Sequence, residues 1–156
     1  MSFVVSGLPL DPFRPLFGLS DEALAERGVI RYVADAPQGF PCRITLTDAR
    51  PGETLLLANY EHQPADTPFR SRHAIFVGEQ AAETARYVDE VPPSLALRPY
   101  ISLRAFDAGG MMLDGQIAPG AELAPVIERM LDVDEVAYLH AHYAGRGCYA
   151  ARIDRR

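Results

Sequence analysis

Lysine is absent from this sequence, and all 15 basic residues are arginine. The absence excludes a Schiff-base lysine, a lysine general base and the lysine of a phosphate-binding P-loop. Any anion that binds must therefore meet arginine, whose planar guanidinium suits carboxylate and phosphate through paired hydrogen bonds. A Gly-rich phosphate motif and the G-x-S-x-G, H-E-x-x-H and C-x-x-C motifs are absent too, so no short signature names a reaction.

Cysteine, basic charge and long apolar runs are also scarce. The two cysteines, in a chain that starts without an export signal or anchor, are expected to be free thiols in a reducing cytoplasm, with a Cys42–Cys148 disulfide as the alternative. The formal net charge of -6 argues against nucleic acid and anionic membranes as partners, because both attract a basic surface. No stretch approaches the ~20 apolar residues of a membrane span. These features predict a soluble cytoplasmic protein.

The chain has 156 residues, of which 48% are apolar, and this is enough to bury a core. We expect a single domain over residues 1–156. Strand patterns dominate, as short β-branched or alternating runs between turn-forming residues. The expected strands cover residues 2–7, 28–35, 42–48, 53–60, 73–78, 100–107, 111–117, 136–143 and 148–154.

Helical patterns are fewer. Residues 20–28 have a serine N-cap and a terminal glycine, and residues 119–132 place apolar side chains at helical spacing around an internal proline. Residues 81–88 fit a helical turn, and the proline-rich residues 91–100 predict a surface crossing. Strands joined by short turns pair antiparallel. The predicted class is therefore α+β, with a mainly antiparallel, curved or sandwich-like sheet and one or two packed helices.

The stretch "LHAHYAGRGCYAARI" (139–153) predicts a hairpin with "AGRG" (144–147) as its turn. Side chains alternate between the faces of a strand, which places one set on the face of the two histidines: Tyr138, His140, His142, Tyr149 and Ala151. The other face then receives Leu139, Ala141, Tyr143, Cys148, Ala150 and Arg152, and we expect the helix at 119–132 to cover it. This separation disfavours a nucleophile pair of Cys148 and His142, unless a bulge at the turn re-aims one of them.

His-x-His on a strand holds two imidazoles about 7 Å apart on one face, which is a common start for a metal site. A third ligand is needed, and His62 or Glu61 could supply it. The alternative interpretation is a polar strand face that is solvated or hydrogen-bonded. The sequence leaves both interpretations open.

Two further polar groups attract attention. The segment "EHQPADTPFRSRH" (61–73) predicts a loop between strands, either functional or simply solvated. Arg43, Arg104 and Arg152 stand among apolar residues, where charge is costly unless it is paired. They predict either an anion-binding pocket or salt bridges to Asp48, Glu61 or Asp107.

Four stretches carry a resemblance to a known family: "GFPCRITLTDARPGE", "LLLANYEHQPADTPFRSRHAIFV", "ISLRAFDAGGMM" and "VAYLHAHYAGRGCYAARID". They resemble a bacterial domain-of-unknown-function family of small single-domain proteins of about this length, over nearly the whole chain. The regions around His62 and around residues 140–148 are the most specific. The resemblance implies a small bacterial single-domain protein, and it implies no activity and no catalytic residue.

The leading hypothesis is a binding domain for a small polar or anionic ligand. Its pocket would be lined by Glu61, His62, Arg70, Arg104, His140 and His142. One rival is a metal-dependent enzyme with the histidines 62, 140 and 142 as ligands and Glu61 as base. Another rival is a cysteine-based enzyme that uses Cys148 as a thiolate. The sequence fixes neither a cofactor nor the oligomeric state.

Overall fold

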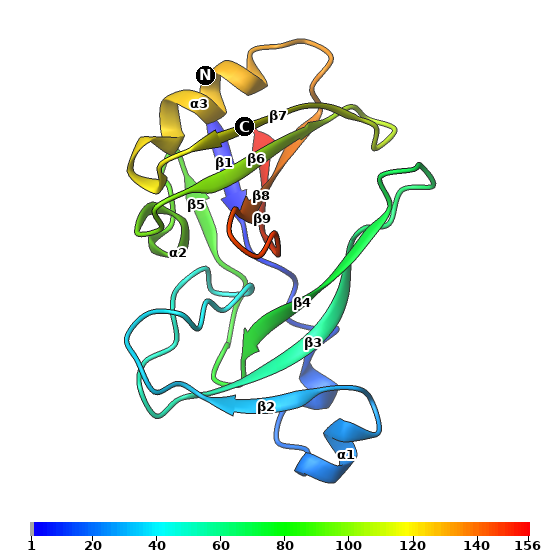
Figure 1. Cartoon of the computed structure of the whole chain (residues 1–156), viewed down its shortest axis with the longest axis vertical. Coiled ribbons are helices and arrows are strands. Elements are labelled where there is room, and N and C mark those ends of the chain that lie inside the picture. Colours follow the sequence, from blue (N-terminus) through cyan, green and yellow to red (C-terminus); the bar gives the residue numbers. More distant parts are fainter. Residues whose placement is uncertain (1) are drawn as a thin grey trace.

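The computed structural model describes residues 2–156 and builds them mainly from antiparallel strands (Figure 1). Six strands form one sheet in the order β5-β1-β9-β8-β6-β7, and three form a second sheet in the order β2-β3-β4. The strands are β1 (Phe3–Ser6), β2 (Ile30–Val33), β3 (Thr54–Gln63), β4 (Ser71–Gly78), β5 (Arg86–Val88), β6 (Ile101–Phe106), β7 (Met112–Ala118), β8 (Tyr138–Tyr143) and β9 (Tyr149–Arg155). The helices are η1 (Arg14–Leu16), α1 (Asp21–Ala25), α2 (Pro93–Ala96), η2 (Gly120–Glu122) and α3 (Leu123–Leu131). The α+β class with antiparallel pairing is confirmed, and the strands divide into two sheets.

The six-stranded sheet has one apolar face and one polar face. The apolar face turns toward α3, where Leu103, Leu139 and Ile153 pack with Ile127 and Leu131 of the helix in one fully buried core. Burial of each such side chain stabilises the folded protein by about 1.5–3 kcal/mol. The helix at 119–132 therefore covers the sheet as expected. The opposite face is left for polar and aromatic side chains.

The three-stranded sheet has a core of its own at the other end of the molecule (Figure 1). Leu56, Ile75 and Val77 pack there with Leu24 of α1. Tyr149 of the six-stranded sheet belongs to the same core. The polar face of the larger sheet therefore meets the smaller sheet rather than solvent alone.

Three expectations for local structure are wrong. Residues 42–48 form a compact loop instead of a strand, because their backbone groups bond to three separate segments: Leu8, Phe76 and Ala85. Residues 81–88 form no helical turn, and β5 at their end pairs with β1. The proline-rich stretch contains α2, whose Ser94 and Leu95 are fully buried rather than at the surface.

The β8–β9 hairpin pairs antiparallel as predicted, but with one extra residue. His142 lies opposite Tyr149 and Ala141 opposite Ala151, so Ala150 bulges out of the ladder. Tyr149 therefore stays on the face of the histidines, whereas Ala151 and Arg152 exchange the faces that strict alternation predicted. Arg152 lies opposite His140. Within residues 2–156, no helix combines the length and the apolar character needed to cross a bilayer.

Candidate metal centre

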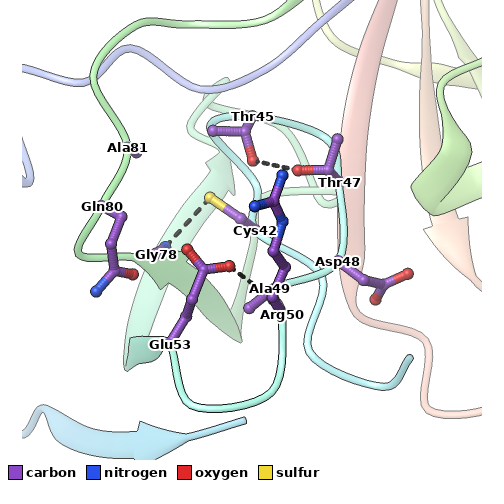
Figure 2. A pocket seen from close by; sticks show the side chains of 10 residues that line it. All are labelled: Cys42, Thr45, Thr47, Asp48, Ala49, Arg50, Glu53, Gly78, Gln80 and Ala81. Carbon is purple, nitrogen blue, oxygen red and sulfur yellow. Dashed lines mark hydrogen bonds between the residues drawn. The ribbon is translucent and has the colours of Figure 1, made fainter. Parts of the chain in front are cut away.

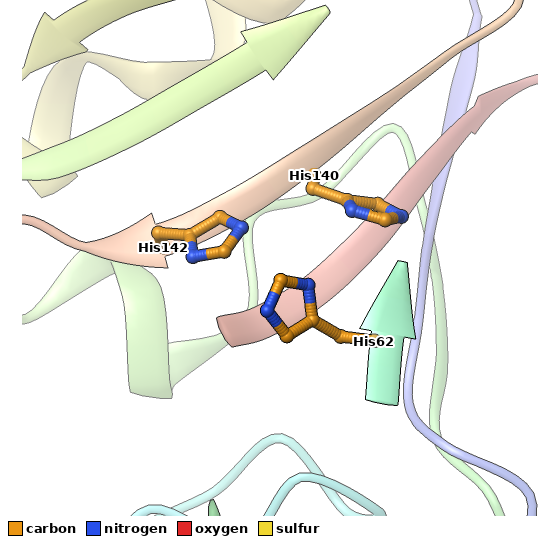
Figure 3. Close-up of side chains that lie close together, drawn as sticks. All are labelled: His62, His140 and His142. Carbon is orange, nitrogen blue, oxygen red and sulfur yellow. The ribbon is translucent and has the colours of Figure 1, made fainter. Parts of the chain in front are cut away.

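Three histidines meet where the two sheets face each other (Figure 3). His62 comes from the end of β3, and His140 and His142 come from one face of β8. One nitrogen from each ring can be chosen so that all three lie within 4.8 Å of one another. The strand β3 carries His62 to this place because it runs three residues beyond the predicted end, with an irregularity between Tyr60 and Gln63.

One nitrogen in each ring of this histidine cluster is buried without a hydrogen-bond partner among residues 2–156. His140 is 3% exposed and His142 is 1% exposed. Within the described residues, Nδ1 of His62, Nδ1 of His140 and Nε2 of His142 form no hydrogen bond. A buried polar atom without a partner costs about 1–3 kcal/mol, so three of them at one point are expensive for stability alone. A cation bound by the cluster would take one lone pair from each of the three rings.

The backbone fixes the orientation of one histidine, His142. Nδ1 of His142 lies 2.9 Å from the carbonyl oxygen of Gly147, which can only accept a hydrogen bond. Nδ1 must therefore carry the proton, and the lone pair is on Nε2, the atom without a partner. A hydrogen bond from the far ring nitrogen to a carbonyl is the usual outer support of a metal-binding histidine.

The three imidazoles are neutral at pH 7. Burial lowers the pKa of His62 to about 4 and the pKa of both His140 and His142 to about 3. The positive charge of Arg104 adds to the effect on each ring. Neutral imidazole is the form that binds a metal ion, so the site favours ligation over protonation.

Aromatic rings hold the cluster in place. The ring of Tyr149 stacks on that of His62 at a centroid distance of 5.2 Å and an angle of 8°. Phe106 packs on His140 with centroids 4.9 Å apart. These contacts restrict the imidazole rotations and exclude water, which strengthens electrostatic interactions inside the site.

Arg104 adds a positive charge on the same face. It lies directly opposite His140 in the β6–β8 ladder, so both side chains leave the sheet on one side. Burial lowers its pKa, yet a guanidinium keeps its charge in proteins. Among residues 2–156 it forms no ion pair, whereas Arg152 across the sheet pairs with Asp154 at 2.9 Å. Arg104 is therefore the strand arginine beside the histidines that has no counter-ion.

The structure brings together four of the six residues proposed for a pocket, the three histidines and Arg104. It does not bring in Glu61 and Arg70, which pair with each other at 3.0 Å on the more exposed side of β3. Glu61 is therefore engaged away from the histidines, and the cluster includes His62 and not Glu61. Sequence reasoning missed Phe106 and Gly147, which have no unusual residue type to mark them.

Both cysteines are free thiols, as expected. Cys42 is buried and its sulfur accepts a hydrogen bond from the amide of Gly78 beside a cavity of about 390 Å³ (Figure 2). At this cavity the Glu53 carboxylate accepts a hydrogen bond from the Arg50 amide, and Asp48 pairs with Arg98. Cys148 lies at the hairpin turn, half-buried, and lines a different hollow instead of packing under α3. The two thiols therefore belong to separate surroundings.

The fold and the site define an α+β protein with a histidine cluster between two antiparallel sheets. The chain belongs to the family described as a protein of unknown function (DUF1203), whose profile matches residues 39–155. The matched region includes all three histidines and Arg104. No curated protein and no solved structure matches the chain.

Proposed function

We propose that this protein binds one transition-metal ion through His62, His140 and His142. Two observations carry the proposal: one nitrogen from each ring lies within 4.8 Å of the other two, and each ring has a buried nitrogen without a hydrogen-bond partner among residues 2–156. Imidazole ligands suit zinc, copper, iron and nickel. Zinc is the first choice, because its tetrahedral sites tolerate three histidines and one further ligand.

The geometry needs a modest contraction to hold an ion. Zinc–nitrogen distances of 2.0–2.1 Å in a tetrahedron separate the nitrogens by about 3.4 Å. The widest nitrogen–nitrogen separation in the histidine cluster, which is at most 4.8 Å, must therefore close by up to about 1.4 Å. Rotations of the imidazoles would supply this change. Water or a small ligand would take the fourth position.

The open position and Arg104 together give the site a chemical role. Three protein ligands with one open position are the pattern of catalytic zinc centres, in which the metal polarises a ligand or activates water. Arg104 stands on the same face and has no counter-ion, so it favours a small anionic ligand at the open position. The function supported best is metal-assisted binding or conversion of a small polar or anionic molecule.

We further propose that the two sheets form one domain in a reducing compartment such as the cytoplasm. The site takes ligands from both sheets, which supports a single folding unit. Two free thiols support the compartment. Cys148 as a catalytic nucleophile has less support, since it lies outside the histidine cluster.

The test is metal content and thermal stability of protein purified without a histidine tag. Wild type loaded with Zn²⁺ should retain about one ion per chain and gain roughly 5–10 °C in Tm at a free zinc concentration 100 times Kd. His140→Ala should lose both effects. His73→Ala is the matched control, because His73 is the one histidine outside the cluster. Substoichiometric zinc in wild type, or equal zinc binding by the two variants, would overturn the proposal.

A further inference from the structure

A second hollow lies beside the β8–β9 turn and has a volume of about 400 Å³. Three arginines, Arg43, Arg98 and Arg146, line it, and no aspartate or glutamate does. The whole chain has 21 acidic and 15 basic residues, so this arginine pocket runs against the overall balance of charge. The volume falls within the range of small-molecule sites.

Arg43 is the most unusual member of the arginine pocket. It is 2% exposed, and its Nε and Nη1 donate to the carbonyl oxygens of Tyr149 and Pro41, each at 2.8 Å. These bonds satisfy donors without neutralising the charge. Within residues 2–156 Arg43 forms no ion pair, although a buried charge is costly without a partner of opposite sign. The structure therefore leaves a buried positive charge beside an open hollow.

The other groups extend this charge toward solvent. Arg98 forms a salt bridge with Asp48 at 2.7 Å. The centroid of the Tyr143 ring lies 5.4 Å from the guanidinium of Arg98 and 5.0 Å from the guanidinium of Arg43. Arg146 is exposed on the turn and forms no ion pair among the described residues. Tyr100, which is 60% exposed, provides an aromatic wall. A bound anion would meet one buried and one exposed guanidinium, with aromatic surface for its body.

We propose that the arginine pocket binds a small organic anion, a carboxylate or a phosphate ester with an aromatic or apolar body. The guanidinium groups of Arg43 and Arg146 hold the anionic group, and Tyr100 contacts the body. Guanidinium forks match both carboxylate and phosphate geometry. This site is distinct from the histidine cluster, and the inference does not depend on a metal ion.

The experiment is calorimetric titration of the metal-free protein with phenyl phosphate and, separately, with benzoate. Saturable one-site binding of either anion is expected, and the stronger of the two identifies the anionic group. Arg146→Gln should weaken binding about tenfold, the size of one lost charge-assisted hydrogen bond. Arg27→Gln, which removes an exposed arginine of the α1 region, is the matched control and should leave the affinity unchanged.

Two further measurements separate this site from the metal centre. His140→Ala should bind the same anion with unchanged affinity, so failure of metal binding leaves this result intact. Bound anion should slow alkylation of Cys148, which lines the pocket, several-fold relative to phenol, the neutral analogue. Absence of saturable binding for both anions, or equal affinities of Arg146→Gln and Arg27→Gln, would overturn the inference.

Discussion

The imidazoles of His62 and His142 lie with their ring centroids 5.0 Å apart and their planes at 78°, although one belongs to β3 and the other to β8. The two strands are in different sheets. Their contact is therefore a tertiary relationship that exists only when the sheets are docked. The properties of the histidine cluster consequently report both on ligation and on the packing of the molecule.

Replacement of His140 by leucine should separate stability from metal binding. Leucine fills similar space and removes a buried nitrogen that has no partner, so the metal-free variant should be about 1 kcal/mol more stable than metal-free wild type. Zinc should no longer stabilise it. Urea denaturation with and without zinc measures both effects. A variant that is less stable without zinc would show that His140 supports the fold by itself.

The metal-free protein should lose stability as the pH falls below the ordinary histidine pKa. The folded-state pKa values of about 4 for His62 and about 3 for His140 and His142 lie below the value of 6.5 in the unfolded chain. Between these limits the unfolded chain binds more protons, so the free energy of unfolding decreases from about pH 6.5 down to about pH 3. Above pH 6.5 the histidines are neutral in both the folded and the unfolded chain, so this loss of stability does not occur there.

Urea denaturation at several pH values checks this expectation. The double variant His140→Leu with His142→Leu should show a shallower slope between pH 6.5 and 4 than wild type. His73→Ala should reduce the slope far less than the double variant, because His73 lies outside the cluster and its charge makes the smallest contribution to the lowered pKa values of His62 and His142. Identical slopes in all three proteins would mean that the histidines take up protons equally in both states.

Gly7 should tolerate no side chain. A methyl group there would overlap the carbonyl oxygen of Ile44, a backbone atom that cannot rotate away. Gly7→Ala should therefore cost about 2–3 kcal/mol through overpacking. Gly115→Ala is the control, because its nearest neighbour would be the Leu103 oxygen at 3.9 Å, an ordinary contact. Thermal melts of the two variants should differ clearly, and equal Tm values would contradict the close approach at Gly7.

Replacement by serine should affect stability differently at the two cysteines. Cys42 is 5% exposed, so Cys42→Ser should cost about 1–2 kcal/mol by burying a hydroxyl. Cys148 is half-buried at the turn, and Cys148→Ser should change the free energy of unfolding by less than about 0.5 kcal/mol. Denaturant melts of the two variants measure both changes in the free energy of unfolding. A larger loss for Cys148→Ser than for Cys42→Ser would place Cys148 in the core.

Period-two alternation was enough to predict that His140 and His142 share a face and that β8 and β9 form a hairpin. It could not predict the bulge at Ala150, because alanines on both faces leave the register weakly specified. The same alternation wrongly predicted a strand at residues 42–48, which form a loop. Ile44 and Leu46 are buried as the pattern requires, yet Leu46 has a φ of 55°, which no strand allows.

The sequence offered His62 or Glu61 as the third ligand, and the metal hypothesis took His62 as the ligand and Glu61 as a base. Only the tertiary structure at the irregular end of β3 shows that His62 reaches the other two histidines. The apolar neighbours of Arg43 predicted a salt bridge or a pocket, but its hydrogen bonds go to backbone carbonyls, one of nearby Pro41 and one of distant Tyr149. The contact with Tyr149 depends on the tertiary fold, which local patterns do not encode.

The division of the three histidines between β3 and β8 has a consequence for motion. An ion that required all three would bind the closed arrangement only, so by thermodynamic reciprocity it would lower the population in which one sheet has opened from the other. Amide hydrogens near the end of β3 would exchange with solvent at a rate set by the free metal concentration. Susceptibility to proteases would follow the same rate, and the lifetime of the protein would become a measure of its metal supply.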